Sequence, residues 1–76
     1  LEVMNRLYES AQNDYARTLQ LNPNQPDSWR RRGIVHLVMK NYKKALADFT
    51  QAVKLAPSME ATLRGKMNAC RSQIAE

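Results

Sequence analysis

Basic side chains are the residues of this chain whose chemistry is most suggestive. The sequence has 12 Lys and Arg against 7 Asp and Glu, giving a formal net charge of +5. Residues 26–57 alone contain seven basic side chains against two acidic ones. A planar guanidinium can hold a carboxylate through two parallel hydrogen bonds. The charge pattern therefore indicates an acidic binding partner or, as the plainer alternative, a well-solvated surface.

The residues that usually perform catalysis or bind metals are scarce. There is one histidine, His36, and one cysteine, Cys70, and neither lies in an H-E-x-x-H or Cys/His spacing. The two glycines form no phosphate-binding loop. We therefore expect no enzyme activity, no metal and no cofactor. Cys70 is spaced with Met67 and Ile74 as a core residue of a helix, and we expect His36 to pack internally rather than to sense pH.

The elements that position these side chains follow from an internal repeat of 34 residues. The segments "YESAQNDYARTLQLNP" and "YKKALADFTQAVKLAP" align, with Tyr8 on Tyr42 and proline ending both. Aromatic and small residues at +3, +7 and +10 share one face of a helix. Because one copy cannot bury that face alone, neighbouring helices must stack.

A further helix is predicted in front of the second copy. In "PDSWRRRGIVHLVMK", Pro26 and Asp27 suit a helix start, and Trp29, Gly33 and His36 share one face. A glycine within a helix costs about 1 kcal/mol relative to alanine. We expect Gly33 to admit the backbone of a neighbouring helix, so that Gly33→Leu would destabilise the protein by a steric clash. The plainer alternative is a simple weak point.

These residues resemble the tetratricopeptide repeat, whose helices read W-x2-L-G-x2-Y and A-x3-F…P. The matching residues are Trp29, Gly33, Ala45, Phe49, Ala52 and Pro57. The chain departs from the pattern at Arg32, where leucine is usual, and at His36, where tyrosine is usual. The resemblance implies an all-α fold of antiparallel helix-turn-helix repeats, which is a fragment of an α-solenoid.

The chain divides into three predicted units. Residues 1–25 form the second helix of a partial repeat, 26–59 a complete repeat, and 60–76 a capping helix with a polar outer face. The alternative for the last segment is the first helix of another repeat. We expect helices at about 2–21, 26–39, 42–55 and 59–75, the first continuous unless it breaks at a turn near residues 5–7. No apolar run is long enough to span a bilayer.

The resemblance also implies where a ligand would bind, because first-helix residues line the concave side of such repeats. That side has Asp27 at its end and is lined by Arg30, Arg31, Ile34, Leu37, Val38, Arg64, Asn68 and Arg71. We expect a non-enzymatic protein-interaction module or scaffold that binds a partner protein or peptide, acidic and with an apolar anchor. The alternative is a solvated face whose aliphatic residues are covered by further helices.

Other functions remain open. The segment "WRRRGIVHLVMKNYKKALADF" looks like the final repeat of co-chaperones and large immunophilins, which grip the acidic tails of heat-shock chaperones with a clamp of lysine, arginine and asparagine. Arg31 matches the clamp arginine, but Asp27 replaces the lysine and Ile34 an asparagine of an earlier repeat. Nucleic-acid binding is disfavoured because no aromatic platform interleaves the basic residues. A purely structural role at the end of a longer solenoid is also open.

The start of the sequence and its single cysteine suggest what the chain belongs to and where it lies in the cell. The sequence opens in mid-pattern and without Met, so we expect a piece of a longer protein, and its uncovered apolar surface predicts self-association. The single cysteine excludes an internal disulfide and fits a reducing compartment, which predicts a cytoplasmic location.

Overall fold

The chain is a row of four α-helices in a computed structural model that describes residues 2–74. The helices are α1 (Glu2–Leu21), α2 (Pro26–Val38), α3 (Tyr42–Leu55) and α4 (Glu60–Ile74), with a short 3-10 turn, η1 (Pro57–Met59), before the last. Residues 2–74 contain no strand. The predicted all-α class is confirmed.

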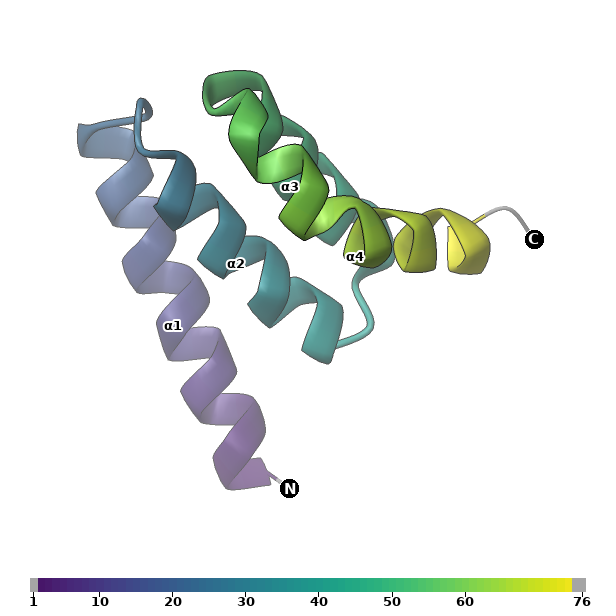
Figure 1. Ribbon diagram of the computed structural model, residues 1–76. Coiled ribbons are helices and arrows are strands. Elements are labelled where there is room, and N and C mark those ends of the chain that lie inside the picture. Colours follow the sequence, from purple (N-terminus) through teal and green to yellow (C-terminus); the bar gives the residue numbers. More distant parts are fainter. Residues whose placement is uncertain (1, 75–76) are drawn as a thin grey trace.

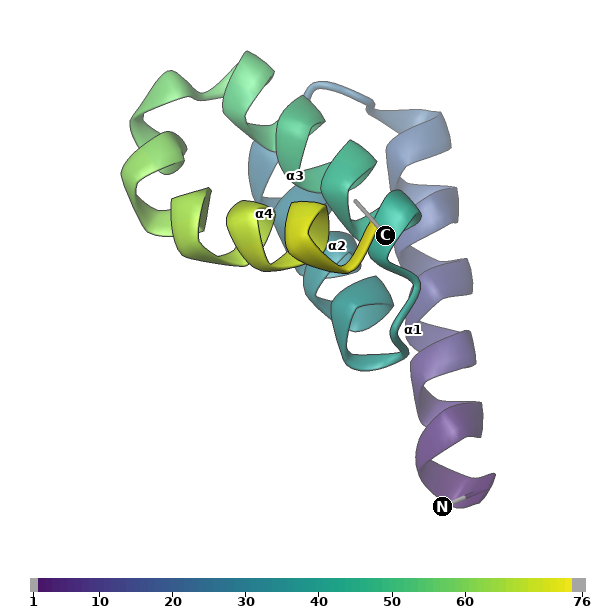
Figure 2. The same cartoon turned by 90° about the vertical axis from the view of Figure 1, so that its right-hand side faces the viewer.

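Each helix packs mainly on its neighbour in the chain. The contacts join α1 to α2, α2 to α3 and α3 to α4. Figure 1 shows α2 returning beside α1 and α3 returning behind α4, while Figure 2 places α1 and α4 at opposite ends of the row. This order is the helix-hairpin stacking that the 34-residue repeat predicts.

The predicted helix bounds agree with the structure except near two ends. The first helix is continuous, as expected, because nothing near residues 5–7 interrupts it. The second ends at Val38, one residue early, because Lys40 takes a left-handed φ of 65° and the Asn41 amide donates to the His36 carbonyl at 2.8 Å. The predicted 59–75 helix begins as the 3-10 turn and then continues as α4; residue 75 lies outside the described part.

The core lies where α3 is covered on both sides. Ala45, Phe49 and Ala52 of α3 are fully buried, and they pack with Leu63 and Cys70 of α4. Cys70 is thus a core residue, as its spacing predicted. The residues of α1 that align with Ala45 and Phe49, 34 positions earlier, are only partly buried. The same pattern is therefore buried fully only where helices flank both sides.

Gly33 accommodates an aromatic ring rather than a helix backbone, which corrects the expectation from the sequence. A Cβ atom at Gly33 would lie 2.7 Å from Cε1 and 2.8 Å from Cδ1 of Phe49. Those distances are too short for carbon atoms in van der Waals contact. Gly33 is therefore required so that the buried Phe49 ring can lie against α2.

Some large apolar side chains remain outside the core. Leu7 and Leu21 on α1 and Val38 on α2 are exposed. Self-association of the chain through such surface stays a prediction. Within residues 2–74, no helix has the length and hydropathy needed to cross a membrane.

Candidate functional site

The arginines expected in the concave groove begin with a cluster at the start of α2. Arg30 Nη2 lies 2.6 Å from Oδ1 of Asp27, and Arg31 Nε lies 2.7 Å from Oδ2 of the same residue. The hydrogen bond from Arg30, with the charge of Arg31, lowers the pKa of the Asp27 carboxyl. The charge of Asp27 raises the pKa of Arg31. Asp27 therefore orders both guanidinium groups on the exposed surface of α2.

The predicted residues of α4 are also exposed and paired within their own helix. Arg64 Nη2 lies 3.4 Å from Oε1 of Glu60, and Arg71 Nη1 donates to Oδ1 of Asn68 at 3.1 Å. Exposed pairs of this kind contribute about 0–1 kcal/mol. A carboxylate from outside can therefore replace Glu60 on Arg64, or Asn68 on Arg71, at a low cost in free energy.

The predicted aliphatic strip is only partly a surface. Ile34 and Leu37 pack against the core, and Val38 alone among the three is exposed. The helices α2 and α4 pack mainly on α3 rather than on each other. Of the eight predicted residues, Arg31, Val38, Arg64, Asn68 and Arg71 are exposed, while Arg30, Ile34 and Leu37 are partly buried.

A buried polar network that the sequence did not predict joins α2 to α3. Arg32 donates from Nε and Nη2 to the two carboxylate oxygens of Asp48, at 2.9 and 2.8 Å. The Asp48 side chain is 5% exposed and that of Arg32 is 21% exposed. The hydrogen bonds to Asp48 raise the pKa of Arg32. Arg32 also lies over the Trp29 ring, 4.9 Å from its centroid.

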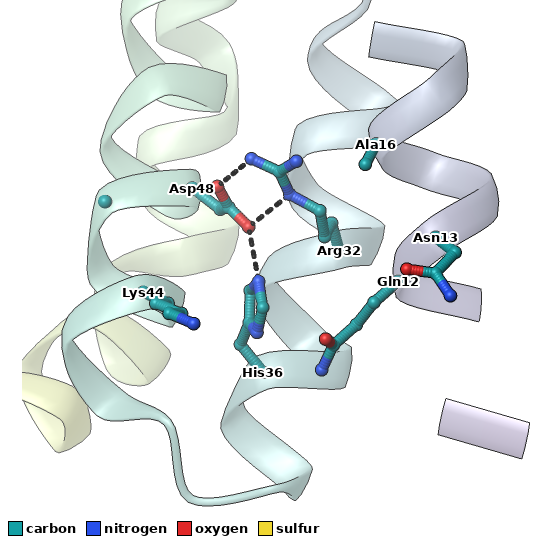
Figure 3. A pocket seen from close by; sticks show the side chains of 8 residues that line it. Gln12, Asn13, Ala16, Arg32, His36, Lys44 and Asp48 are labelled. Atoms are coloured by element: carbon teal, nitrogen blue, oxygen red, sulfur yellow. Dashed lines mark hydrogen bonds and ion pairs between the residues drawn. The ribbon is translucent and has the colours of Figure 1, made fainter. Parts of the chain in front are cut away.

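His36 extends this network along α2, one turn beyond Arg32 (Figure 3). Its Nε2 atom lies 3.5 Å from Oδ2 of Asp48, and its Nδ1 atom is buried without a hydrogen-bond partner within the described residues. Burial lowers the pKa of His36; the charges of Arg32 and Lys44 act in the same direction, and Asp48 opposes them. His36 is therefore neutral at neutral pH. It is buried, as expected, but against an ion pair rather than in an apolar core.

These side chains form the floor of a groove between α1 and α3. A hollow of about 390 Å³ is lined by residues of three helices: Gln12, Asn13, Ala16, Arg32, His36, Lys44, Ala47 and Asp48. A second hollow, of about 650 Å³, shares Asn13, Ala16 and Arg32 with it and continues to Trp29. We call the two together the Arg32 groove.

The sequence did contain a signal for this groove. Arg32 and His36 are the two departures from the repeat pattern, and they lie one turn apart on the same helix face. A charged residue at a position that normally packs needs a buried partner, and Asp48 supplies it. Within the described residues, no group of three or more His, Cys, Asp or Glu side chains is arranged to hold a metal ion.

Comparison with known proteins gives one family. A family model described as tetratricopeptide repeat matches residues 3–75. No curated protein and no solved structure matches the chain significantly. The match covers all four helices, including the first and the last, for which the repeat pattern in the sequence is incomplete.

Proposed function

Because the chain belongs to the tetratricopeptide repeat family, whose repeats mediate interactions between proteins, we propose that it is a non-enzymatic module that binds a partner protein or peptide. The family match over residues 3–75 is the observation on which this proposal depends. The three predicted units, namely a partial repeat over 1–25, a complete repeat over 26–59 and a cap over 60–76, form part of the proposal.

The exposed faces of α2 and α4 are the proposed contact surface. These faces have two carboxylates, those of Asp27 and Glu60. They have four arginines: Arg30, Arg31, Arg64 and Arg71. The excess positive charge favours an acidic ligand. Arg31 binds Asp27 through Nε, and its side chain is exposed, so a second carboxylate can approach it. Exposed Val38 on α2 offers an apolar contact, and exposed Asn68 on α4 a polar one.

The narrower role in binding chaperone tails gains no support. Asp27 places a carboxylate where that clamp needs a lysine, and this carboxylate is hydrogen-bonded to both Arg30 and Arg31. We therefore propose an acidic partner without assigning it to that class. We also propose a cytoplasmic location, because a sequence with a single cysteine fits a reducing compartment.

An array of acidic and neutral peptides tests this surface. The wild-type chain should select acidic peptides that contain an apolar residue, and Arg31→Ala and Arg64→Ala should each weaken that binding by about two- to fivefold. Lys54→Ala is the matched control, because Lys54 is an exposed cation that belongs to α3 rather than to α2 or α4. Equal binding by all four proteins would remove these arginines from the site. Binding that ignores peptide sequence and falls steeply with salt would instead indicate nonspecific electrostatic attraction, the behaviour expected of a surface for phosphates.

A further inference from the structure

We propose that the Arg32 groove is a second binding site, which takes an acidic peptide segment whose carboxylate lies beside an apolar side chain. This site lies on a different face of α2 from the proposed contact surface. Trp29, Arg32 and His36 recur at i, i+3 and i+7 on that helix, so they share one face. Ile34 and Val38 fall on the opposite face. The family match assigns no ligand to the Arg32 groove.

The first argument is the charge of the groove. Three cations, Arg17, Arg32 and Lys44, line it against one carboxylate, Asp48. Asp48 already accepts two hydrogen bonds from Arg32, so its charge is neutralised within the fold. The remaining excess is positive and lies at the exposed Arg17 and Lys44. An acidic segment is the complementary occupant.

The second argument is that Arg32 is held in place before a ligand arrives. Its Nε and Nη2 atoms bind Asp48, and its guanidinium lies over Trp29. Figure 3 shows the remaining guanidinium nitrogen turned away from Asp48, toward the Ala16 side of α1. A donor that is already immobilised loses little conformational entropy on binding. Arg32 can therefore serve two carboxylates, one internal and one from the ligand.

The third argument is the apolar end of the groove. Trp29 Nε1 donates to the Pro23 carbonyl at 2.8 Å, which fixes the indole ring beside Leu19 in the larger hollow. Leu19 is itself buried. This end is a hollow of about 650 Å³. It suits the apolar residue of the same peptide segment.

The fourth argument is that the polar end of the groove is open to a ligand side chain. Ala16 and Ala47 are small residues on α1 and α3, and they leave room for a side chain to enter a hollow of about 390 Å³. That volume lies within the usual range of ligand sites. Lys44 is exposed at the rim of this hollow, beside the Arg32 guanidinium, so an acidic side chain that enters meets positive charge.

The chain contains its own reporters for this site. Trp29 is the only tryptophan and His36 the only histidine, and they lie at the two ends of the groove. The probe is a peptide of Leu and Glu residues with blocked ends, compared with the same peptide containing Gln for Glu. We expect the Glu peptide to change Trp29 fluorescence saturably. It should also raise the pKa of His36, followed by NMR, because a carboxylate near an imidazole stabilises its charged form.

Charge-removing variants assign the site. Arg17→Gln and Lys44→Gln should each weaken Glu-peptide binding by about two- to fivefold, while Lys54→Gln should change it by less than about twofold. All three residues are exposed, so folding is little affected. The proposal fails if Lys54→Gln matches Lys44→Gln, if the Gln peptide binds equally, or if neither reporter responds at millimolar peptide. It also fails if Arg31→Ala alone abolishes the response, because the peptide would then occupy the opposite face.

Discussion

The two glycines give the sharpest test of how this fold is packed. Gly33 and Gly65 both lie inside helices, in α2 and α4, so a change to alanine improves helix propensity equally at both. Their surroundings differ. A Cβ atom at Gly33 would meet the Phe49 ring at 2.7 Å, whereas at Gly65 nothing lies within 4 Å. We therefore expect Gly65→Ala to stabilise the protein and Gly33→Ala to destabilise it.

The size of the difference follows from these contacts. Alanine in place of glycine gains about 1 kcal/mol at either site. Overpacking a core costs about 1–3 kcal/mol, and only Gly33→Ala incurs this cost, because the fully buried Phe49 ring must move. The two variants should thus differ by about 1–3 kcal/mol. For a chain of 76 residues this corresponds to a Tm lower by about 4–24 °C in Gly33→Ala than in Gly65→Ala.

Thermal and urea denaturation followed by circular dichroism measure this difference. A rescue experiment tests the cause: on a Phe49→Leu background the ring is absent, so Gly33→Ala should become neutral or stabilising. The larger change Gly33→Leu should destabilise the protein more than Gly33→Ala does. If Gly33→Ala proves as stable as Gly65→Ala, the ring contact does not determine the packing of α2 on α3, and the reasoning is wrong.

Three further predictions concern the ionisable side chains that the fold buries or partly buries. Arg32→Leu and Asp48→Ala should each lower the free energy of unfolding by about 3 kcal/mol. The double variant should lose less than the sum of the two, as urea denaturation of all four proteins would measure. Additive losses would show that the pair is not coupled. Burial lowers the pKa of His36 from 6.5, so the unfolded chain binds more protons than the folded one below that value. Stability should therefore fall as pH falls through 6.5 toward the lower folded value, and His36→Gln should reduce this dependence, as urea titrations at several pH values would detect. Burial raises the pKa of Cys70, and its side chain is inaccessible, so alkylation should be slow in buffer and should accelerate only as urea unfolds the chain.

Much of the fold could be predicted from the sequence because it depends on local periodicity. The alignment of Tyr8 with Tyr42 indicated two similar helices, and proline after each set their ends. The structure has α3 at Tyr42–Leu55, as predicted. The spacing of Cys70 identified it as a core residue for the same reason, since the helical period alone selects the buried face.

The candidate sites were less predictable. The eight groove residues were chosen from the expected faces of α2 and α4, but Ile34 and Leu37 turn out to pack on the core. The Arg32 groove was missed, because its floor depends on Asp48, which is 16 residues away from Arg32. Whether either face binds a peptide stays a prediction.

The sequence by itself determined the helices, the repeat and the buried faces of α3 and α4, because these follow from spacing along one chain. Only the tertiary structure decided which partner each unusual residue meets. The Phe49 ring lies over Gly33. The Asp48 carboxylate accepts hydrogen bonds from Arg32 and lies close to His36. The distances of these contacts are set by how α2 crosses α3. Packing of two helices fixes such contacts to a few tenths of an ångström, and no periodicity within either helix encodes that distance.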